Sequence, residues 1–299
     1  MFSLKGSIVA LVTPMDLGGG IAWQSLFDLI DWHIESGTKG IVFVGTTGES
    51  ATIDVSEHVQ IIEQSSTYAK GRIPVIAGTG ANSTKEAIYL TSAAKKAGAD
   101  ATLLVTPYYN RPTQEGLIAH YSEIANSVDI PQILYNVPAR TGCDLLPETV
   151  LKLSRHKNII GLKEATPDLK RLDELKEVLN SQMKDEPFLL YSGDDPTSAQ
   201  FILNGGSGAI SVTANVVPSK ISEICNSALS GNSEEAFSLN ALLDDLNVFL
   251  FIESNPIPVK WILHRLGRIP AGLRLPLTTL DKKYHKEIEI ILKKLSLLN

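Results

Sequence analysis

The sequence predicts an α/β fold, a (β/α)8 TIM barrel with a C-terminal helical appendage, and three features indicate it. Eight short apolar runs rich in β-branched residues recur along the chain, and segments with helical spacing lie between them. The runs follow one another at roughly 20 to 33 residues, which suits a barrel of about 250 residues. They are nearly continuously apolar, as expected when both faces of a parallel sheet are covered. A doubly wound sheet is the competing architecture, but eight regular units without an obvious crossover favour closure.

The expected strands and helices follow in order along the chain. Residues 83–99, STKEAIYLTSAAKKAGA, show the helical pattern that separates the runs, with a glycine near the end. The strand signal stops after residue 225, so we expect a catalytic barrel of residues 1–225 and a helical region of residues 226–299. The predicted strands lie in residues 6–14, 40–48, 73–80, 101–107, 132–138, 159–166, 188–195 and 208–215, and the C-terminal helices in residues 232–253, 257–267 and 282–295.

The composition narrows the class of protein. The chain has 299 residues, 43% of them hydrophobic and 20% charged, which is ordinary for a globular protein. A net charge of −6 argues against nucleic acid as a partner and weakly against an anionic membrane surface. Cys143 and Cys225 form no CxxC pattern, and no apolar stretch reaches the roughly 18 residues that a membrane span needs. We therefore expect a cytoplasmic protein that binds neither nucleic acid nor membrane.

In a barrel of this kind the chemistry lies where strands end and βα loops begin. Polar side chains at the predicted strand ends are mostly hydroxyls, and no histidine is among them. The six histidines fall in helix-like segments, so the sequence supports neither a histidine metal site nor a Ser–His–Asp triad. Asp195 precedes a proline, which is typical of a helix start and favours capping over paired acid–base catalysis for Asp194 and Asp195.

Lys163 ends the apolar run of residues 159–162 and is the most informative candidate. An ordinary interpretation is a lysine paired with Glu164 or extended to water. Side chains alternate along a strand, however, so Glu164 would point away from Lys163. Apolar surroundings disfavour the charged amine and lower its pKa, which leaves free amine to attack a ketone and form a Schiff base.

Two other predicted strand ends carry side chains that suit such a reaction. Tyr135 could shuttle protons during imine formation, or could simply fill the barrel. Thr46 and Thr47 lie in the turn GTTGES, whose hydroxyls and N–H groups suit a small carboxylate but also an ordinary turn. Arg140 follows the Tyr135 strand and could bind a second carboxylate bidentately, or could be a surface loop arginine.

Long ordered motifs identify a family resemblance over almost the whole chain. GTTGES, VTPYYNRP, YNVPARTG, GLKEAT, SGDD, GAISVTANV and NPIPVKW resemble the 4-hydroxy-tetrahydrodipicolinate synthase (dihydrodipicolinate synthase) family of pyruvate-dependent class I aldolases. The resemblance implies condensation of pyruvate with L-aspartate 4-semialdehyde, a lyase reaction of diaminopimelate and lysine biosynthesis. It implies no metal or organic cofactor, only a covalent imine between Lys163 and pyruvate.

The resemblance also implies residue roles. Lys163 would form the Schiff base, Tyr135 would be the general acid/base, and Thr46 would link Tyr135 to Tyr109 of a neighbouring subunit. The substrate-binding positions would be Thr47 for the pyruvate carboxylate, Arg140 for the semialdehyde carboxylate, and the carbonyls of Gly193 and Ile210.

The family resemblance further implies assembly and regulation. A relay residue from a neighbouring subunit requires at least a dimer, and the family form is similar to a homotetramer built as a dimer of dimers. L-lysine would be an effector in a dimer-interface cleft. Val55 stands where lysine-sensitive relatives often have His or Lys, so we expect weak inhibition. The positions that match the effector site are Ser50, Ala51, His58, Asn82, Glu86 and Tyr108.

Other functions remain open at this point. N-acetylneuraminate lyase and keto-deoxy-sugar-acid aldolases share the Lys and Tyr, although Arg140 and Thr47 favour the semialdehyde. A nucleotide-binding oxidoreductase is poorly supported, because GTGAN at residues 78–82 lacks the third glycine and the acidic residue of that motif. A non-catalytic binding protein on the same scaffold would not need Lys163, Tyr135, Thr46 and Tyr109 together.

Overall fold

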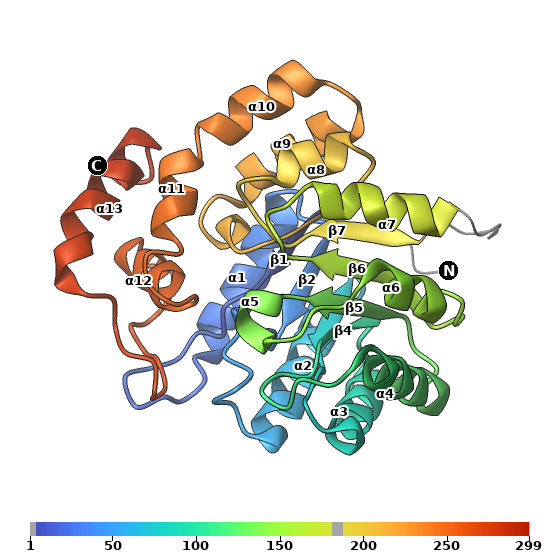
Figure 1. Ribbon diagram of the computed structural model, residues 1–299. Coiled ribbons are helices and arrows are strands. Elements are labelled where there is room, and N and C mark those ends of the chain that lie inside the picture. Colours follow the sequence, from blue (N-terminus) through green and yellow to red (C-terminus); the bar gives the residue numbers. More distant parts are fainter. Residues whose placement is uncertain (1–3, 181–187, 299) are drawn as a thin grey trace.

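The computed structural model describes residues 4–180 and 188–298, and their strands form one closed parallel barrel (Figure 1). Strands that are consecutive in the chain are neighbours in the barrel, and β8 pairs with β1 to close it. The predicted α/β class and TIM barrel are therefore confirmed, and the doubly wound alternative is excluded.

Each predicted strand run contains one strand of the barrel. The strand takes the apolar part of the run, and the polar residues that follow enter the βα loop, where the chemistry of such barrels is found. The strands are β1 (Gly6–Ala10), β2 (Gly40–Phe43), β3 (Val75–Gly78), β4 (Ala101–Val105), β5 (Gln132–Asn136), β6 (Ile159–Glu164), β7 (Leu189–Ser192) and β8 (Gly208–Ser211).

Alternation along each strand divides the core into an inner and an outer part. In β5, Ile133 and Tyr135 pack inside the barrel with residues such as Val42, whereas Leu134 packs outward in a cluster with Leu117 of a covering helix. Both faces of the strand are thus buried, which explains the nearly continuous apolar runs.

Helices cover the barrel, and several begin at side-chain caps that the sequence supplies. Asp54, Ser83 and Thr113 each accept a hydrogen bond from the backbone N–H three residues ahead, which satisfies a donor that the helix leaves free. The helices that accompany the barrel are α1 (Trp23–Glu35), α2 (Val55–Ala69), α3 (Thr84–Lys96), α4 (Gln114–Ser127), α5 (Pro138–Thr141), α6 (Pro147–Leu153), α7 (Lys170–Asn180), α8 (Ser198–Leu203), the 3-10 turn η1 (Thr213–Asn215) and α9 (Pro218–Leu229).

The C-terminal region is helical, as predicted, and lies against one side of the barrel (Figure 1). The predicted helix of residues 232–253 is in fact two helices and a turn, while the other two helices lie within their predicted ranges. The proposed division at residue 225 falls inside α9 and stays a prediction. The elements are α10 (Ser233–Ala241), α11 (Asp244–Phe249), α12 (Ile257–Arg265), η2 (Lys282–Tyr284) and α13 (His285–Lys294).

Candidate active site

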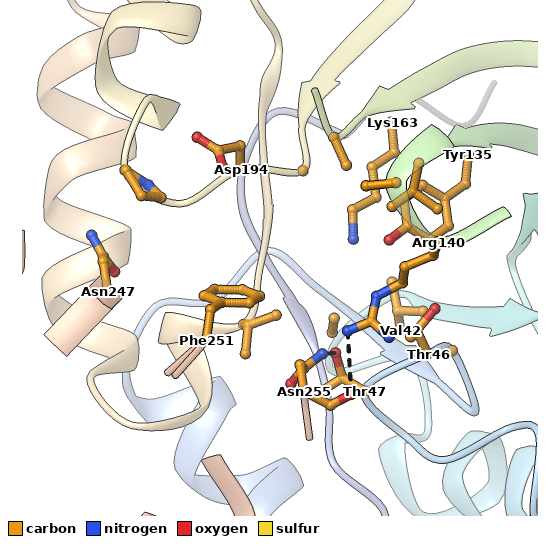
Figure 2. Close-up of a pocket in the computed structure, with 18 of the residues that line it drawn as sticks. Val42, Thr46, Thr47, Tyr135, Arg140, Lys163, Asp194, Asn247, Phe251 and Asn255 are labelled. Carbon is orange, nitrogen blue, oxygen red and sulfur yellow. Dashed lines mark hydrogen bonds between the residues drawn. The ribbon is translucent and has the colours of Figure 1, made fainter. Parts of the chain in front are cut away.

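A cavity of about 630 Å³ opens at the carboxyl ends of the strands. Its lining combines residues of the strand ends with residues of α11 and of the segment before α12. Figure 2 shows Lys163, Tyr135 and Arg140 on one side of the pocket and Phe251 and Asn247 on the other. The C-terminal region therefore supplies part of the wall of this site.

Lys163 lies in β6 with its side chain in the cavity lining and only 4% exposed. It is in register with Tyr135 of β5, and its Nζ lies 4.4 Å from the centroid of the tyrosine ring. Burial lowers the pKa of Lys163 from 10.5 to about 8, with Arg140 acting in the same direction and Asp195 opposing it. The amine is therefore far richer in its nucleophilic form than an exposed lysine would be.

Glu164 lies on the opposite face of β6, as the alternation predicts. Its Oε2 accepts a hydrogen bond from Asn136 at 3.0 Å and its Oε1 accepts one from the Thr166 N–H at 2.9 Å. The Arg171 guanidinium is 3.8 Å from the same carboxylate. The partners of the Glu164 carboxylate all lie outside the cavity. Pairing with Glu164 therefore does not account for the buried position of Lys163.

The interpretation of Asp195 as a helix cap is wrong. The helix that follows begins only at Ser198, and Asp195 Oδ2 instead accepts from the Val212 and Thr213 N–H groups, at 2.9 and 3.0 Å. Asp194 does serve the turn before the helix, because its Oδ2 accepts from the Thr197 N–H at 3.2 Å. Asp195 thus ties the end of β7 to the end of β8, and its charge favours the protonated amine of Lys163.

Tyr135 is buried, and burial raises the pKa of its phenol above 10. The nearby Arg140 charge and a hydrogen bond between the Tyr135 and Thr46 side chains oppose that rise. The hydroxyl therefore stays protonated at neutral pH while remaining connected to a polar neighbour, which suits a group that gives and takes a proton.

The turn after β2 holds Thr46 and Thr47 in an unusual backbone. Val44 has φ 51° and Glu49 has φ 60°, a region that non-glycine residues seldom adopt. Both threonines line the cavity, and Thr47 is almost fully buried. Such strained turns are typical of functional sites.

Arg140 and Gly193 lie in the lining as well. Arg140 is exposed at the cavity edge, and its Nη2 donates to the Asn255 carbonyl at 3.3 Å. A Cβ at Gly193 would lie 2.7 Å from Lys163 Cε, so a side chain there would displace the lysine. Ile210 pairs with Ile8 in the register of β1 and β8, and its side chain packs in the barrel interior.

Tyr109 lies apart from the cavity within one chain. Its side chain is 91% exposed and its φ is 74°. The relay assigned to it needs a second chain and stays a prediction.

The positions expected to bind lysine lie on loops and helices at the same end of the barrel, and two of them, Asn82 and Tyr108, are in direct contact. Asn82 Nδ2 donates to the Tyr108 carbonyl at 3.2 Å. Burial and the charge of Glu86 both raise the pKa of Tyr108. Burial lowers the pKa of His58 to about 4, so it is neutral at pH 7. Ser50 and Ala51 lie in the turn before α2.

Two kinds of feature are absent from the described residues, 4–180 and 188–298. No cluster of His, Cys, Asp and Glu among them has the arrangement of a metal site. None of their helices combines the length and apolar character needed to cross a membrane.

Sequence reasoning assigned no role to two residues that the structure joins to the turn after β2. Asn255 Nδ2 donates to Thr47 Oγ1 at 2.9 Å, and Lys260 forms a buried ion pair with Glu49. Both residues lie in the motif NPIPVKW, and their partners are more than 200 positions away in the chain. The motif was recognisable, but nothing in its spacing indicates those partners.

Comparison with known proteins agrees with this geometry. The family model described as the dihydrodipicolinate synthetase family matches residues 3–295. The chain belongs to this family. The 4-hydroxy-tetrahydrodipicolinate synthase of Pseudomonas savastanoi pv. phaseolicola is 59% identical to it over 290 residues, which cover 97% of this chain and 98% of that protein.

Solved structures of dihydrodipicolinate synthases share the fold over nearly their full length. The chloride-inhibited enzyme of Acinetobacter baumannii complexed with pyruvate has a TM-score of 0.95 and 52% identity, covering 99% of this chain and 100% of that one. The Cyanidioschyzon merolae enzyme with lysine bound has a TM-score of 0.93 and 37% identity, covering 98% of this chain and 99% of that one. The resemblance drawn from the motifs is therefore confirmed.

Proposed function

We propose that this protein is a lyase that condenses pyruvate with L-aspartate 4-semialdehyde to give 4-hydroxy-tetrahydrodipicolinate, in diaminopimelate and lysine biosynthesis. The observation that carries the proposal is the buried Lys163 amine, with a pKa of about 8, in a cavity that it shares with Tyr135, Thr47 and Arg140. Relatives that carry this enzyme name at high identity support it, as does a similar structure that holds pyruvate.

The first half of the reaction joins pyruvate to the enzyme. The free amine of Lys163 attacks the keto carbon of pyruvate, and the resulting carbinolamine loses water to form an imine. Tyr135 donates the proton that allows hydroxide to leave as water, and Thr46 holds its phenol in the relay. Thr47 binds the pyruvate carboxylate. No metal or organic cofactor takes part, since the imine itself is the electron sink.

The second half builds the ring. Tyr135, which has given up its proton, takes one from the pyruvate methyl group to form an enamine, and the enamine carbon attacks the aldehyde. The resulting alkoxide takes that proton back from Tyr135 and becomes the 4-hydroxyl. The amino group of the semialdehyde then attacks the imine carbon and displaces the Lys163 amine. Arg140 holds the semialdehyde carboxylate at the mouth of the cavity, where a guanidinium fits it bidentately. The carbonyls of Gly193 and Ile210 complete the binding site.

Assembly and regulation belong to the same proposal. Tyr109 enters the site of a second chain, and the working form is a homotetramer built as a dimer of dimers. Its 91% exposure in a single chain supports a role at an interface. L-lysine binds weakly at Asn82, Glu86 and their neighbours, which the lysine-bound relative supports. The cytoplasmic location stays a prediction, consistent with two free cysteines.

The proposal is tested by a coupled assay of pyruvate with a panel of aldehydes. We expect turnover with L-aspartate 4-semialdehyde and little with N-acetylmannosamine or with the aldehydes that keto-deoxy-sugar-acid aldolases use. Efficient turnover of a hydroxylated sugar aldehyde, with none of the semialdehyde, would instead assign the protein to one of those aldolases. Sedimentation of the same sample tests the tetramer, and a stable, fully active monomer would contradict the shared Tyr109.

A further inference from the structure

Asn255 is a buried residue of the C-terminal region that reaches the centre of the site. It lies just before α12, is 6% exposed and belongs to the cavity lining. Figure 2 shows it beside Thr47, across the pocket from Lys163, with Arg140 extending toward both. A polar side chain buried at such a point needs a partner to offset the loss of water.

The hydrogen bond from Asn255 determines the role of the Thr47 hydroxyl as donor or acceptor. Asn255 Nδ2 donates to Thr47 Oγ1 at 2.9 Å, so the threonine oxygen is the acceptor. Among the residues that the structure describes, Asn255 is the one hydrogen-bond partner of that hydroxyl. The hydroxyl hydrogen is therefore left to donate elsewhere, and Thr47 lines the cavity. A donor facing the cavity is what a substrate carboxylate requires.

The backbone of Asn255 makes a second contact with the site. Its carbonyl accepts from Arg140 Nη2 at 3.3 Å. One residue thus contacts both side chains that are proposed to bind carboxylates, through two different groups. A change to the side chain leaves the carbonyl in place, so the two contacts can be separated by substitution.

An ion pair anchors the Asn255 segment to the turn that carries Thr47. Lys260 of α12 pairs with Glu49, and both side chains are almost fully buried. The other oxygen of Glu49 accepts from the Arg274 N–H at 3.2 Å. Because Glu49 is two residues from Thr47, these contacts hold Asn255 and Thr47 at a fixed separation.

We infer that Asn255 is a positioning residue that orients the Thr47 hydroxyl as a hydrogen-bond donor to the carboxylate of the keto-acid substrate. The inference rests on the proposed function, and it assigns to the C-terminal region a part in substrate recognition. Asn255 itself need not touch the substrate, because it acts through Thr47.

The test measures imine formation without aldehyde, by trapping with borohydride over a range of pyruvate concentrations. Asn255→Ala removes the donor and should raise the pyruvate concentration for half-saturation about tenfold, the effect of one charge-assisted hydrogen bond. Asn255→Asp has nearly the same shape but can only accept, so it turns the threonine hydrogen away from the substrate. Asn255→Asp should therefore raise the half-saturation concentration of pyruvate more than Asn255→Ala does. Asn226→Ala, on the exposed face of α9, is the matched control and should behave as the unchanged protein.

Two further readouts separate orientation from a general structural role. In a Thr47→Val background, Asn255→Ala should cause little further rise in the half-saturation concentration of pyruvate, because the hydroxyl that Asn255 orients is already gone. The KM for the semialdehyde should change less than about twofold in Asn255→Ala, because the carbonyl that contacts Arg140 remains. If Asn255→Ala instead loosened the loop, it would weaken the binding of both substrates. It would also raise the half-saturation concentration of pyruvate further in the Thr47→Val background.

Each result decides between the proposals. Normal pyruvate saturation in Asn255→Ala or in Asn255→Asp, or an undiminished effect in the Thr47→Val background, would overturn the inference while leaving the proposed function intact. Absence of any trapped adduct in the unchanged protein would instead reject the proposed function, and the inference with it.

Discussion

Replacing Lys163 by methionine should abolish turnover and at the same time stabilise the folded protein at neutral pH. Methionine is unbranched and of similar length, so it can fill the same space without a charge. Burial lowers the pKa of Lys163 from 10.5 to about 8, which means that the fold opposes the charged amine. A pKa difference of one corresponds to about 1.4 kcal/mol, so the charged amine lowers the free energy of unfolding by about 3 kcal/mol.

The sign of this effect determines its pH dependence. Below about pH 8 the amine is protonated in both folded and unfolded chains, so the full cost is present. Between about pH 8 and 10.5 the unfolded chain binds the proton more tightly, and the contribution of this group to stability improves as the pH rises. The advantage of Lys163→Met should therefore be largest at pH 7 and should shrink toward pH 10.5.

The assay is thermal unfolding of both proteins across that pH range, compared as the difference in Tm so that other titrations cancel. We expect Lys163→Met to unfold several degrees higher at pH 7. Lys286→Met, at an exposed lysine of α13, is the control and should show little change. A Lys163→Met protein that is no more stable than the unchanged one at pH 7, or an advantage that does not vary with pH, would refute the reasoning.

Four other substitutions, one of them combined with another, test the remaining proposals. Tyr135→Phe keeps the ring over the amine but removes the hydroxyl, so kcat in the coupled assay should fall about 10²- to 10⁴-fold; an unchanged kcat would remove Tyr135 as the proton donor. Glu49→Gln leaves Lys260 charged and buried without a carboxylate and should cost about 3–5 kcal/mol in urea unfolding. Lys260→Met added to it should restore most of that loss, because the unpaired buried charge is then gone, and failure to do so would mean that the loss does not come from an uncompensated Lys260 charge. Glu86→Gln should abolish the weak inhibition by millimolar lysine while leaving turnover intact, and a flat inhibition curve in the unchanged protein would reject the lysine site.

Periodicity carried the prediction of the fold a long way. The eight runs predicted the barrel because each strand must bury both of its faces. Burial of both faces requires apolar residues at consecutive positions, which can be seen in the sequence. Alternation within β6 also placed Lys163 and Glu164 on opposite faces, which the hydrogen bonds of Glu164 confirm. These features depend only on neighbours in the chain.

Contacts between segments far apart in the chain could not be predicted from periodicity or alternation. Asp195 precedes a proline and has the local pattern of a cap, yet its carboxylate binds backbone N–H groups at the end of β8. Asn255 and Lys260 meet their partners across more than 200 positions, so local pattern could not reveal either contact. Tyr109 is exposed in a single chain, and its role can be tested only where a second chain is present.

The most direct test is borohydride reduction of the protein in the presence of pyruvate, followed by peptide mapping. The account predicts one reduced pyruvate adduct on each chain, on the peptide that carries Lys163, and none without pyruvate or in Lys163→Met. An unchanged mass, or an adduct on a different lysine, would contradict it.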